Sequence, residues 1–321
     1  MTKTLGIFCG GFSSEFEISM KSARNIAKNF PTEYKAYLIV VSNSEWYAVY
    51  KENKFQFFRE DLSILHGNER MKLDLGLVYI HGEPGENGKI QALLDLHMIP
   101  YLNSGVLASS LSFDKWYCNQ FLKTFGFNVA ASIRLNREQK YNASEIIGNL
   151  GLPVFVKPCD SGSSYGISKV NTIVELAPAI KIAFSEGSSL VIESFLKGIE
   201  VTCGVYRNNN ELVALPLTEI VSENDFFDYD AKYNGKSQEI TPARISDENK
   251  NKIQASAKEI YELLNLRSIA RIDFMLVEDF PYVIEVNTTP GFSDASIVPK
   301  MLETANISVG EFWSQILKTE L

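Results

Sequence analysis

The sequence has few histidines, few cysteines and no long apolar segment. Its four cysteines are widely separated and form no C-x-x-C pair, so neither a zinc site nor a disulfide framework is indicated. No apolar run approaches the length of a membrane-spanning helix. The N-terminal apolar stretch breaks at Gly10-Gly11 and is too short for a signal peptide. We therefore expect a cytoplasmic protein with no membrane partner.

The sequence also has fewer basic than acidic residues. The 31 Lys and Arg residues are outnumbered by 39 Asp and Glu residues, which leaves a net charge of -8. A nucleic-acid-binding protein usually carries a concentrated basic stripe, so nucleic acid is not an expected partner. The Walker A pattern and the G-x-G-x-x-G dinucleotide fingerprint are both missing. Small-molecule substrates are therefore expected, bound without these two nucleotide-binding loops.

The 321 residues can form two or three domains. Short apolar strands alternate with helical patterns over the first hundred residues, which predicts an open α/β sheet with crossover helices. The helix that follows the first strand is expected to start with Ser14 as its cap and to end near Asn29. We place domain boundaries so that an N-terminal domain spans residues 1–103, a central domain 104–195 and a C-terminal domain 196–321.

Two stretches near the C-terminus predict a hairpin with a polar face. Residues 271–276 and 282–287 both alternate polar and apolar side chains at the period of a strand. A turn near Asp279 would place Asp273 opposite Glu285 and Arg271 opposite Asn287. Hard oxygen ligands of this kind suit Mg²⁺ carried on nucleotide phosphates, and an adjacent arginine suits the charge of a moving phosphoryl or acyl group. The alternative is a solvent-facing hairpin with a cross-strand ion pair.

A second candidate region lies between residues 153 and 200. An apolar strand ends at Lys157, and the small-residue loop 159–166 that follows can lay backbone amides and hydroxyls over phosphates. A plain flexible hairpin fits this loop equally well. The apolar strand 190–196 can present an edge to an adenine, with Glu200 downstream for a ribose.

Two residues of the first domain also lie where ligands bind in open α/β sheets. Glu15 follows the first strand directly, so its carboxylate stands at the carboxyl end of the sheet and could hold a substrate ammonium group. A simple role in the first turn of the helix is the alternative. His81 ends another strand and starts a Gly-rich turn, which suits either a substrate contact or a structural hydrogen bond.

Taken together, these segments resemble the D-alanine:D-alanine ligases of the ATP-grasp superfamily. The motifs that carry the resemblance run in family order from Gly10 to beyond Pro299, and they are Gly10-Gly11-x-Ser13-x-Glu15, His81-Gly82-x-x-Gly85-Glu86, Lys157-Pro158, Gly162-Ser163-Ser164-x-Gly166, Asp230-Ala231-Lys232-Tyr233, Arg271-Ile272-Asp273 and Glu285-x-Asn287-x-x-Pro290-Gly291. The resemblance implies an α/β fold, partly α+β, in which a Rossmann-like open-sheet domain precedes two ATP-grasp domains.

The resemblance also implies a role for each matched residue. The phosphates of ATP would contact Lys115, Lys157 and Ser164. Its adenine would contact Glu193, Phe195 and Leu196, and its ribose would contact Glu200. Two Mg²⁺ or Mn²⁺ ions per site would bind Asp273, Glu285 and Asn287. The first substrate would be oriented by Glu15, Ser163 and Tyr233, with Lys232 on the γ-phosphate and His81 as a further substrate contact. The second substrate would bind Ser296 and Ile297, with Arg271 and the Gly291 amide on the oxyanion.

The implied reaction forms an acyl phosphate from D-alanine and ATP, which a second D-alanine attacks to give the dipeptide for peptidoglycan synthesis. The family also implies a homodimer. Two alternatives remain open at this point. One is an ATP-grasp ligase with another acceptor, such as D-serine or D-lactate, and the other is a nucleotide-binding regulator without catalysis. The combination of Arg271 with Asp273, Glu285 and Asn287 favours an enzyme over a regulator.

Overall fold

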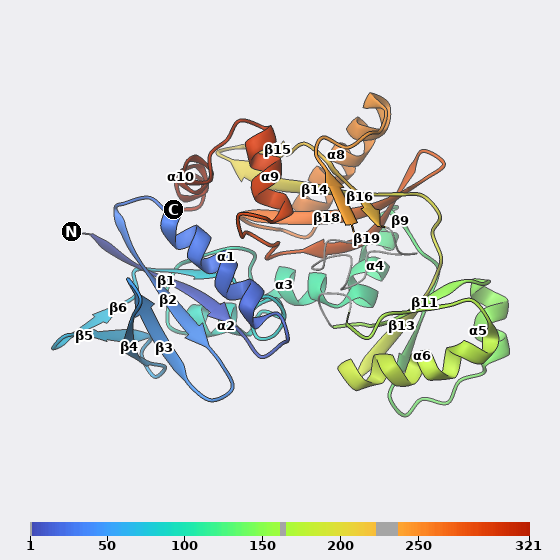
Figure 1. Cartoon of the computed structure of the whole chain (residues 1–321), viewed down its shortest axis with the longest axis horizontal. Coiled ribbons are helices and arrows are strands. Elements are labelled where there is room, and N and C mark those ends of the chain that lie inside the picture. Colours follow the sequence, from blue (N-terminus) through green and yellow to red (C-terminus); the bar gives the residue numbers. More distant parts are fainter. Residues whose placement is uncertain (1, 161–164, 223–236) are drawn as a thin grey trace.

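The structure is a computed structural model that describes residues 2–160, 165–222 and 237–321. Within these residues the strands form three sheets of eight, four and seven strands. Figure 1 shows them as three groups: a blue and cyan N-terminal group, a green and yellow central group, and an orange and red C-terminal group that carries both the last helices and the chain end. The predicted α/β fold class is confirmed.

The eight-stranded sheet belongs to the N-terminal group and has the order β6-β5-β4-β3-β2-β1-β7-β8. Strands β2, β1, β7 and β8 run parallel, and β3 to β6 continue the sheet as an antiparallel meander. Its elements are β1 (Lys3–Gly10), α1 (Phe16–Asn29), β2 (Tyr34–Val41), β3 (Trp46–Tyr50), β4 (Asn53–Phe58), β5 (Ser63–His66), β6 (Glu69–Lys72), β7 (Leu75–Val78), α2 (Lys89–Leu96) and β8 (Tyr101–Leu102). Strand β1 is buried from Thr4 onward because it lies inside the parallel part of the sheet.

The predicted cap of the first helix was wrong. Helix α1 begins at Phe16, and Ser14 does not cap it. Ser13 instead accepts a hydrogen bond from the Glu15 amide and donates to the His81 carbonyl oxygen. This serine hydroxyl therefore ties the start of α1 to the turn after β7.

The four-stranded sheet is wholly antiparallel and has the order β10-β13-β11-β12. Two helices cover it, and its core of apolar side chains draws only on residues 133–192. The elements are β10 (Ser132–Asn136), α5 (Ala143–Leu150), β11 (Val154–Pro158), β12 (Ser168–Val170), α6 (Ile173–Glu186) and β13 (Ser189–Ser194). This unit therefore packs as a body with a core of its own.

The seven-stranded sheet has the order β17-β16-β14-β18-β19-β9, with β15 paired to β14. Its strands are β9 (Asn128–Val129), β14 (Ile199–Asn208), β15 (Glu211–Ala214), β16 (Thr218–Ser222), β17 (Ser237–Ile240), β18 (Ile269–Val277) and β19 (Phe280–Asn287). The helices packed around it are α3 (Val106–Phe113), α4 (Lys115–Thr124), α8 (Asp247–Leu263), α9 (Ile297–Thr304) and α10 (Val309–Glu320). Because α3, α4 and β9 contact β19, residues 106–129 pack with this sheet rather than with the four-stranded one. The domain division at residue 104 stays a prediction.

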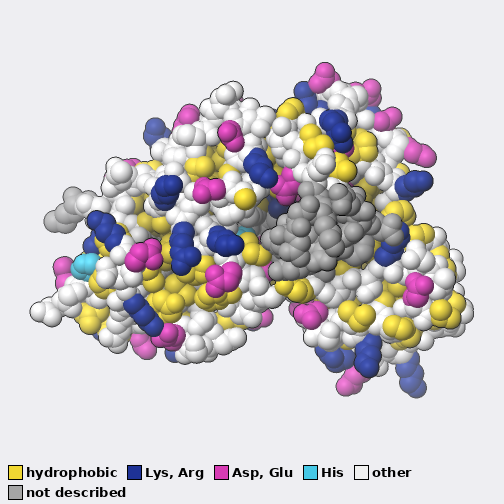
Figure 2. All heavy atoms as spheres, viewed as in Figure 1, with side chains coloured by type: hydrophobic (Ala, Val, Ile, Leu, Met, Phe, Trp, Pro, Cys, Tyr) yellow, Lys and Arg dark blue, Asp and Glu magenta, His cyan; other side chains and the backbone are white. Residues whose placement is uncertain are grey.

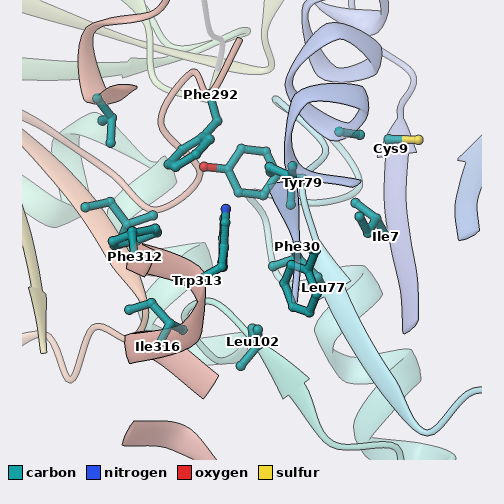
Figure 3. Close-up of a cluster of buried hydrophobic side chains, with 14 of the residues drawn as sticks. Ile7, Cys9, Phe30, Leu77, Tyr79, Leu102, Phe292, Phe312, Trp313 and Ile316 are labelled. Carbon is teal, nitrogen blue, oxygen red and sulfur yellow. The ribbon is translucent and has the colours of Figure 1, made fainter. Parts of the chain in front are cut away.

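One hydrophobic core joins the N-terminal and C-terminal sheets. It combines side chains of β1, β7 and α1 with side chains of β14, α9 and α10. Figure 3 shows its centre, where Phe292 and Trp313 of the C-terminal group lie beside Tyr79 of the N-terminal group, and Phe312 packs next to Trp313. These two sheets are therefore packed into one body, beside the separately packed four-stranded sheet.

The surface visible in Figure 2 carries Lys and Arg side chains interspersed with Asp and Glu side chains. The described side chains on this face do not gather into one basic stripe. Among the helices of the described residues, none is both long and apolar enough to cross a membrane.

The hairpin β18–β19 allows a matched test of the core. Phe274 is fully buried against α8, whereas Phe280 in the same hairpin is 61% exposed. We expect Phe274→Ala to lower the free energy of unfolding by about 3–5 kcal/mol, because it removes a large buried side chain and leaves a cavity. Phe280→Ala should change that free energy by less than about 0.5 kcal/mol. Urea denaturation of the two variants measures both values, and equal losses would contradict the packing described here.

Candidate active site

A bulge in the β18–β19 hairpin decides which side chains face the site. The chain turns at Glu278-Asp279, both with positive φ, and pairs Val277 with Phe280. Continued without interruption, that register would put Glu285 on the opposite face from Asp273. The register shifts by one residue between Asp273 and Phe274, and Ile284 is the extra residue on β19. Asp273 therefore pairs with Glu285 and Arg271 with Asn287, which confirms the predicted register.

Arg271, Asp273 and Asn287 form a tight cluster on this face. The Arg271 guanidinium donates to both Asp273 carboxylate oxygens, at 2.8 Å from Nε and 2.7 Å from its terminal nitrogen. Thr202 donates to the same carboxylate, and Asn287 Nδ2 donates to it at 3.2 Å. Burial alone would lower the pKa of Arg271, but the adjoining Asp273 charge raises it, so this guanidinium stays positive.

The same face offers hard oxygens for a divalent cation. Asp273 and Glu285 supply carboxylates, and Asn287 uses its Nδ2 as a donor, which leaves its amide oxygen as an acceptor. No three His, Cys, Asp or Glu side chains form a complete metal cage within the described parts of the chain. Mg²⁺ does not need one, because it typically takes one or two carboxylates together with phosphate oxygens and water. The donor set therefore fits an ion that arrives with a nucleotide.

A cavity of about 770 Å³ lies above this face. Every candidate residue that the structure describes lines it, namely Glu15, His81, Lys115, Lys157, Glu193, Phe195, Leu196, Glu200, Arg271, Asp273, Glu285, Asn287, Gly291, Ser296 and Ile297. Ser163, Ser164, Lys232 and Tyr233 lie outside the described residues. The cavity thus joins side chains from all three sheets, which the chain separates by up to 282 residues.

Two partly buried lysines stand at the side of the cavity formed by α4 and β11. Asp114 caps α4 by accepting the Tyr117 amide, and this starts the helix at Lys115. Lys115 lies 3.6 Å from Glu285, and Lys157 forms a 2.8 Å ion pair with Glu193. Burial alone would lower the pKa of Lys157, but the charge of Glu193, its hydrogen bond and the more distant carboxylates together raise that pKa above its ordinary value. Both ammonium groups are therefore suited to anionic phosphates.

An apolar and aromatic wall adjoins these lysines. The Phe195 ring lies 5.9 Å from the Phe155 ring, and the Lys169 ammonium stands 4.9 Å from the Phe195 ring centre. Leu196 and Glu200 continue along the same wall. A flat heterocycle could lie against such a surface, while a carboxylate such as Glu200 could bind hydroxyls.

The opposite end of the cavity belongs to the N-terminal sheet. Glu15 is only 8% exposed. The turn at Gly82 passes close to its carboxylate, because a Cβ atom added at Gly82 would lie 3.5 Å from Glu15 Oε2. His81 is buried beside it, with its Nε2 atom 3.2 Å from the Ser22 hydroxyl. Burial lowers the pKa of His81. This end therefore presents a carboxylate and an uncharged imidazole to a ligand.

The loop after β19 closes this end of the cavity. Gly291 lines it, and an added Cβ at Gly291 would meet the Ser296 hydroxyl at 3.0 Å. Ser296 accepts a hydrogen bond from the Ser293 amide and stands directly before α9, whose first residue is Ile297. The N-terminus of this helix is favourable for a carboxylate, because its first backbone amides have no partner within the helix.

Several cavity residues were missed as candidates, chiefly three carboxylates. Glu219 on β16 pairs with Arg244, and Glu239 on β17 pairs with Lys300 of α9, at 2.8 Å in both cases. Their position follows from strand pairing that no local signal reveals. Glu86 was part of a quoted motif, but its burial could not be read from the sequence.

Glu86 should make stability depend on pH. Burial, and then the negative charge of Glu15, raise the pKa of Glu86 to about 7. The folded protein therefore binds this proton more tightly than the unfolded chain does. As the pH rises toward 7, the proton is lost and the free energy of unfolding falls. Above that pH, the free energy of unfolding stays lower by the full amount. We expect Glu86→Gln to have a higher Tm than the wild type at pH 8.5, with a difference that shrinks toward pH 5. The exposed Glu60→Gln variant is the control for thermal denaturation, and a difference independent of pH would contradict the assignment.

Comparison with known proteins identifies the family. A family model described as the D-ala D-ala ligase N-terminus matches residues 4–104, and one described as the D-ala D-ala ligase C-terminus matches residues 121–318. The D-alanine–D-alanine ligase of Parabacteroides distasonis is 40% identical over 324 residues, which span 100% of this chain and 98% of that protein.

Solved structures agree over the whole chain. The VanG D-Ala:D-Ser ligase from Enterococcus faecalis is 29% identical, with a TM-score of 0.89 and full coverage of both chains. The Bacillus anthracis D-alanine–D-alanine ligase complexed with ATP is 26% identical, with a TM-score of 0.79 over 99% of this chain and 97% of that one. The expected ATP-grasp fold of these ligases is therefore confirmed, and the chain belongs to the D-alanine–D-alanine ligase family.

Proposed function

We propose that this protein joins two molecules of D-alanine to D-alanyl-D-alanine with ATP, as a step toward peptidoglycan. The observation that carries the proposal is one shared cavity in which partly buried cations, carboxylates and a helix N-terminus meet. In the first step the carboxylate of one D-alanine attacks the γ-phosphorus of ATP, which gives D-alanyl phosphate and ADP. In the second step the free amine of another D-alanine attacks the acyl carbon, and phosphate leaves as the peptide bond forms.

The cavity divides into regions that suit the parts of this reaction. Lys115 and Lys157 would hold the phosphates of ATP, with adenine against Phe195 and Leu196, near Glu193, and ribose on Glu200. Asp273, Glu285 and Asn287 would hold Mg²⁺ or Mn²⁺, which would neutralise phosphate charge when bound. The Asp273 oxygens already accept hydrogen bonds from Arg271, Thr202 and Asn287, so a cation there competes with these donors. Two ions per site and a homodimer stay predictions.

The substrate end suits two amino acids. Glu15 would bind the ammonium group of the first D-alanine, with His81 beside it. The N-terminus of α9 at Ser296 and Ile297 would bind the carboxylate of the second. Arg271 and the Gly291 amide would stabilise the oxyanion of the tetrahedral intermediate between them. For Ser163, Tyr233 and Lys232 the predicted roles rest on the family motifs alone.

The acceptor separates this proposal from its main alternative. The VanG neighbour is named a D-Ala:D-Ser ligase, whereas the 40% identical relative is named a D-alanine–D-alanine ligase. The higher identity favours D-alanine as acceptor. A regulator without catalysis would have little use for a buried arginine beside an acidic oxygen cluster.

The direct test measures ADP release by the purified protein with ATP and Mg²⁺. D-Alanine, L-alanine, D-serine and D-lactate are supplied in turn, each alone and each together with D-alanine, with the product mass read alongside. Release that depends on D-alanine alone, with D-alanyl-D-alanine as product, is the expected result. A mixed product with D-serine or D-lactate would reassign the acceptor, and ATP binding without turnover on any substrate would favour a regulator.

Arg271 allows a test of the oxyanion role. Arg271→Ala should lower kcat by about 10²–10³, the loss typical for removing one donor to an oxyanion, while ATP affinity stays within about twofold. Because the change leaves Asp273 without its partner, thermal stability is measured in parallel, together with the Arg271→Lys variant. Arg207→Ala is the matched control, since Arg207 pairs with Glu262 at the surface and does not line the cavity. Wild-type turnover in Arg271→Ala would remove the assigned role.

A further inference from the structure

Three side chains of the N-terminal group, Ser22 and Asn25 on α1 and Tyr79 just after β7, hold the backbone on either side of Gly291. The Tyr79 hydroxyl donates to the Pro290 carbonyl at 3.0 Å, and Asn25 Nδ2 donates to the Phe292 carbonyl at 2.8 Å. The Ser22 hydroxyl accepts the Phe292 amide at 3.1 Å. Three consecutive peptide groups of this loop are therefore hydrogen-bonded to residues more than 200 positions away in the chain.

The geometry of one peptide group links Tyr79 to the candidate oxyanion donor. The Pro290 carbonyl and the Gly291 amide belong to the same planar unit, and this peptide bond is trans. In a trans peptide the C=O and N–H groups point in opposite directions. A hydrogen bond that holds the Pro290 oxygen on Tyr79 therefore turns the Gly291 N–H away from the core, toward the cavity that Gly291 lines.

The Gly291 amide needs such a constraint because glycine restricts its own backbone least of all residues. Within residues 2–160, 165–222 and 237–321, no group accepts a hydrogen bond from this amide. The amide is thus available to a ligand, while the peptide groups beside it are occupied. A hydrogen bond to the carbonyl of the same peptide also polarises the amide and strengthens it as a donor.

The anchoring side chain is itself rigid. Tyr79 is fully buried, and its ring lies 5.9 Å from Phe292 and 6.3 Å from Trp313. Figure 3 shows the Tyr79 hydroxyl directed toward the segment that carries Phe292. Burial raises the pKa of Tyr79 well above its ordinary value, so the hydroxyl keeps its proton and can donate at any working pH. The position of the Pro290 carbonyl is therefore set by the core that joins the two sheets.

We propose that Tyr79 is a positioning residue for catalysis, which aims the Gly291 amide at the tetrahedral oxyanion by holding the Pro290 carbonyl, with Ser22 and Asn25 fixing the next two peptide groups. The inference rests on the proposed function, since it concerns the oxyanion of that reaction. It assigns a catalytic consequence to hydrogen bonds that otherwise would only satisfy buried polar groups.

The test removes the hydroxyl and keeps the ring. Tyr79→Phe retains the packing with Phe292 and Trp313, so the fold should survive. We expect kcat to fall by about tenfold, less than the 10²–10³ typical for complete loss of an oxyanion donor, because the amide remains but is less well aimed. KM for D-alanine and ATP affinity should stay within about twofold. Affinity for a phosphinate analogue of the tetrahedral intermediate should fall by a factor similar to kcat, because such analogues report transition-state binding.

Tyr206→Phe is the matched control. Tyr206 is a buried tyrosine of the same core, but its hydroxyl donates to Gln315 rather than to the loop. Its removal should cost comparable stability and leave kcat and analogue affinity unchanged. If both variants lose the same small amount of stability and neither changes kcat, Tyr79 is merely structural and the inference is overturned.

A second variant covers failure of the first to fold. Asn25→Ala frees the Phe292 carbonyl and should also lower kcat and analogue affinity more than it changes KM, and unchanged values would overturn the inference. The wild-type protein is assayed in the same series. A wild type that forms no dipeptide would defeat the proposed function itself, which is distinct from an active wild type with an equally active Tyr79→Phe.

Discussion

The register of the β18–β19 hairpin is the constraint on which the rest of the site depends. Side chains alternate along a strand, so a slip of one residue would transfer every polar group to the other face. The single extra residue at Ile284 aligns Glu285 and Asn287 with Arg271 and Asp273. The same pairing leaves Ile272 and Phe274 of β18 and Val283 and Val286 of β19 in the core that also contains the buried side chains of α8. Burial of the core and assembly of the polar face are therefore two results of one pairing pattern.

The cavity is built by two bodies that are packed in different ways. The N-terminal and C-terminal sheets share a core, so Glu15 and His81 are held against the loop of Gly291 by the same apolar contacts that stabilise the fold. Lys157 lies on β11 of the four-stranded sheet, and Phe195 directly follows β13 of the same sheet. This sheet has its own core. The end of the cavity that carries Glu15 and His81 thus rests on one shared core, whereas the end that carries Lys157 and Phe195 is assembled between separately packed units.

Charge inside the cavity is compensated within the protein. Arg271 pairs with Asp273, Lys157 pairs with Glu193, and Lys115 lies close to Glu285. Buried cations would be costly without these carboxylates. An entering phosphate or oxyanion must therefore compete with an existing partner. In the reaction proposed above, these donors would already be in place for the negative charge that develops, in surroundings that screen it less than water does.

Sequence analysis predicted the strand patterns and the ordered motifs that identify the family. From a turn near Asp279 it also predicted the pairing of Arg271 and Asp273 with Asn287 and Glu285, which the structure reaches through a two-residue turn and a bulge. These features could be predicted because they depend on local alternation and on short spacings. Only the folded structure shows the bulge at Ile284, the burial of Glu86 and the contact between Tyr79 and the Pro290 carbonyl, 211 residues apart. The bulge interrupts the alternation from which the strands were predicted. The other two features depend on which distant elements pack together, and no periodicity in the chain records that choice.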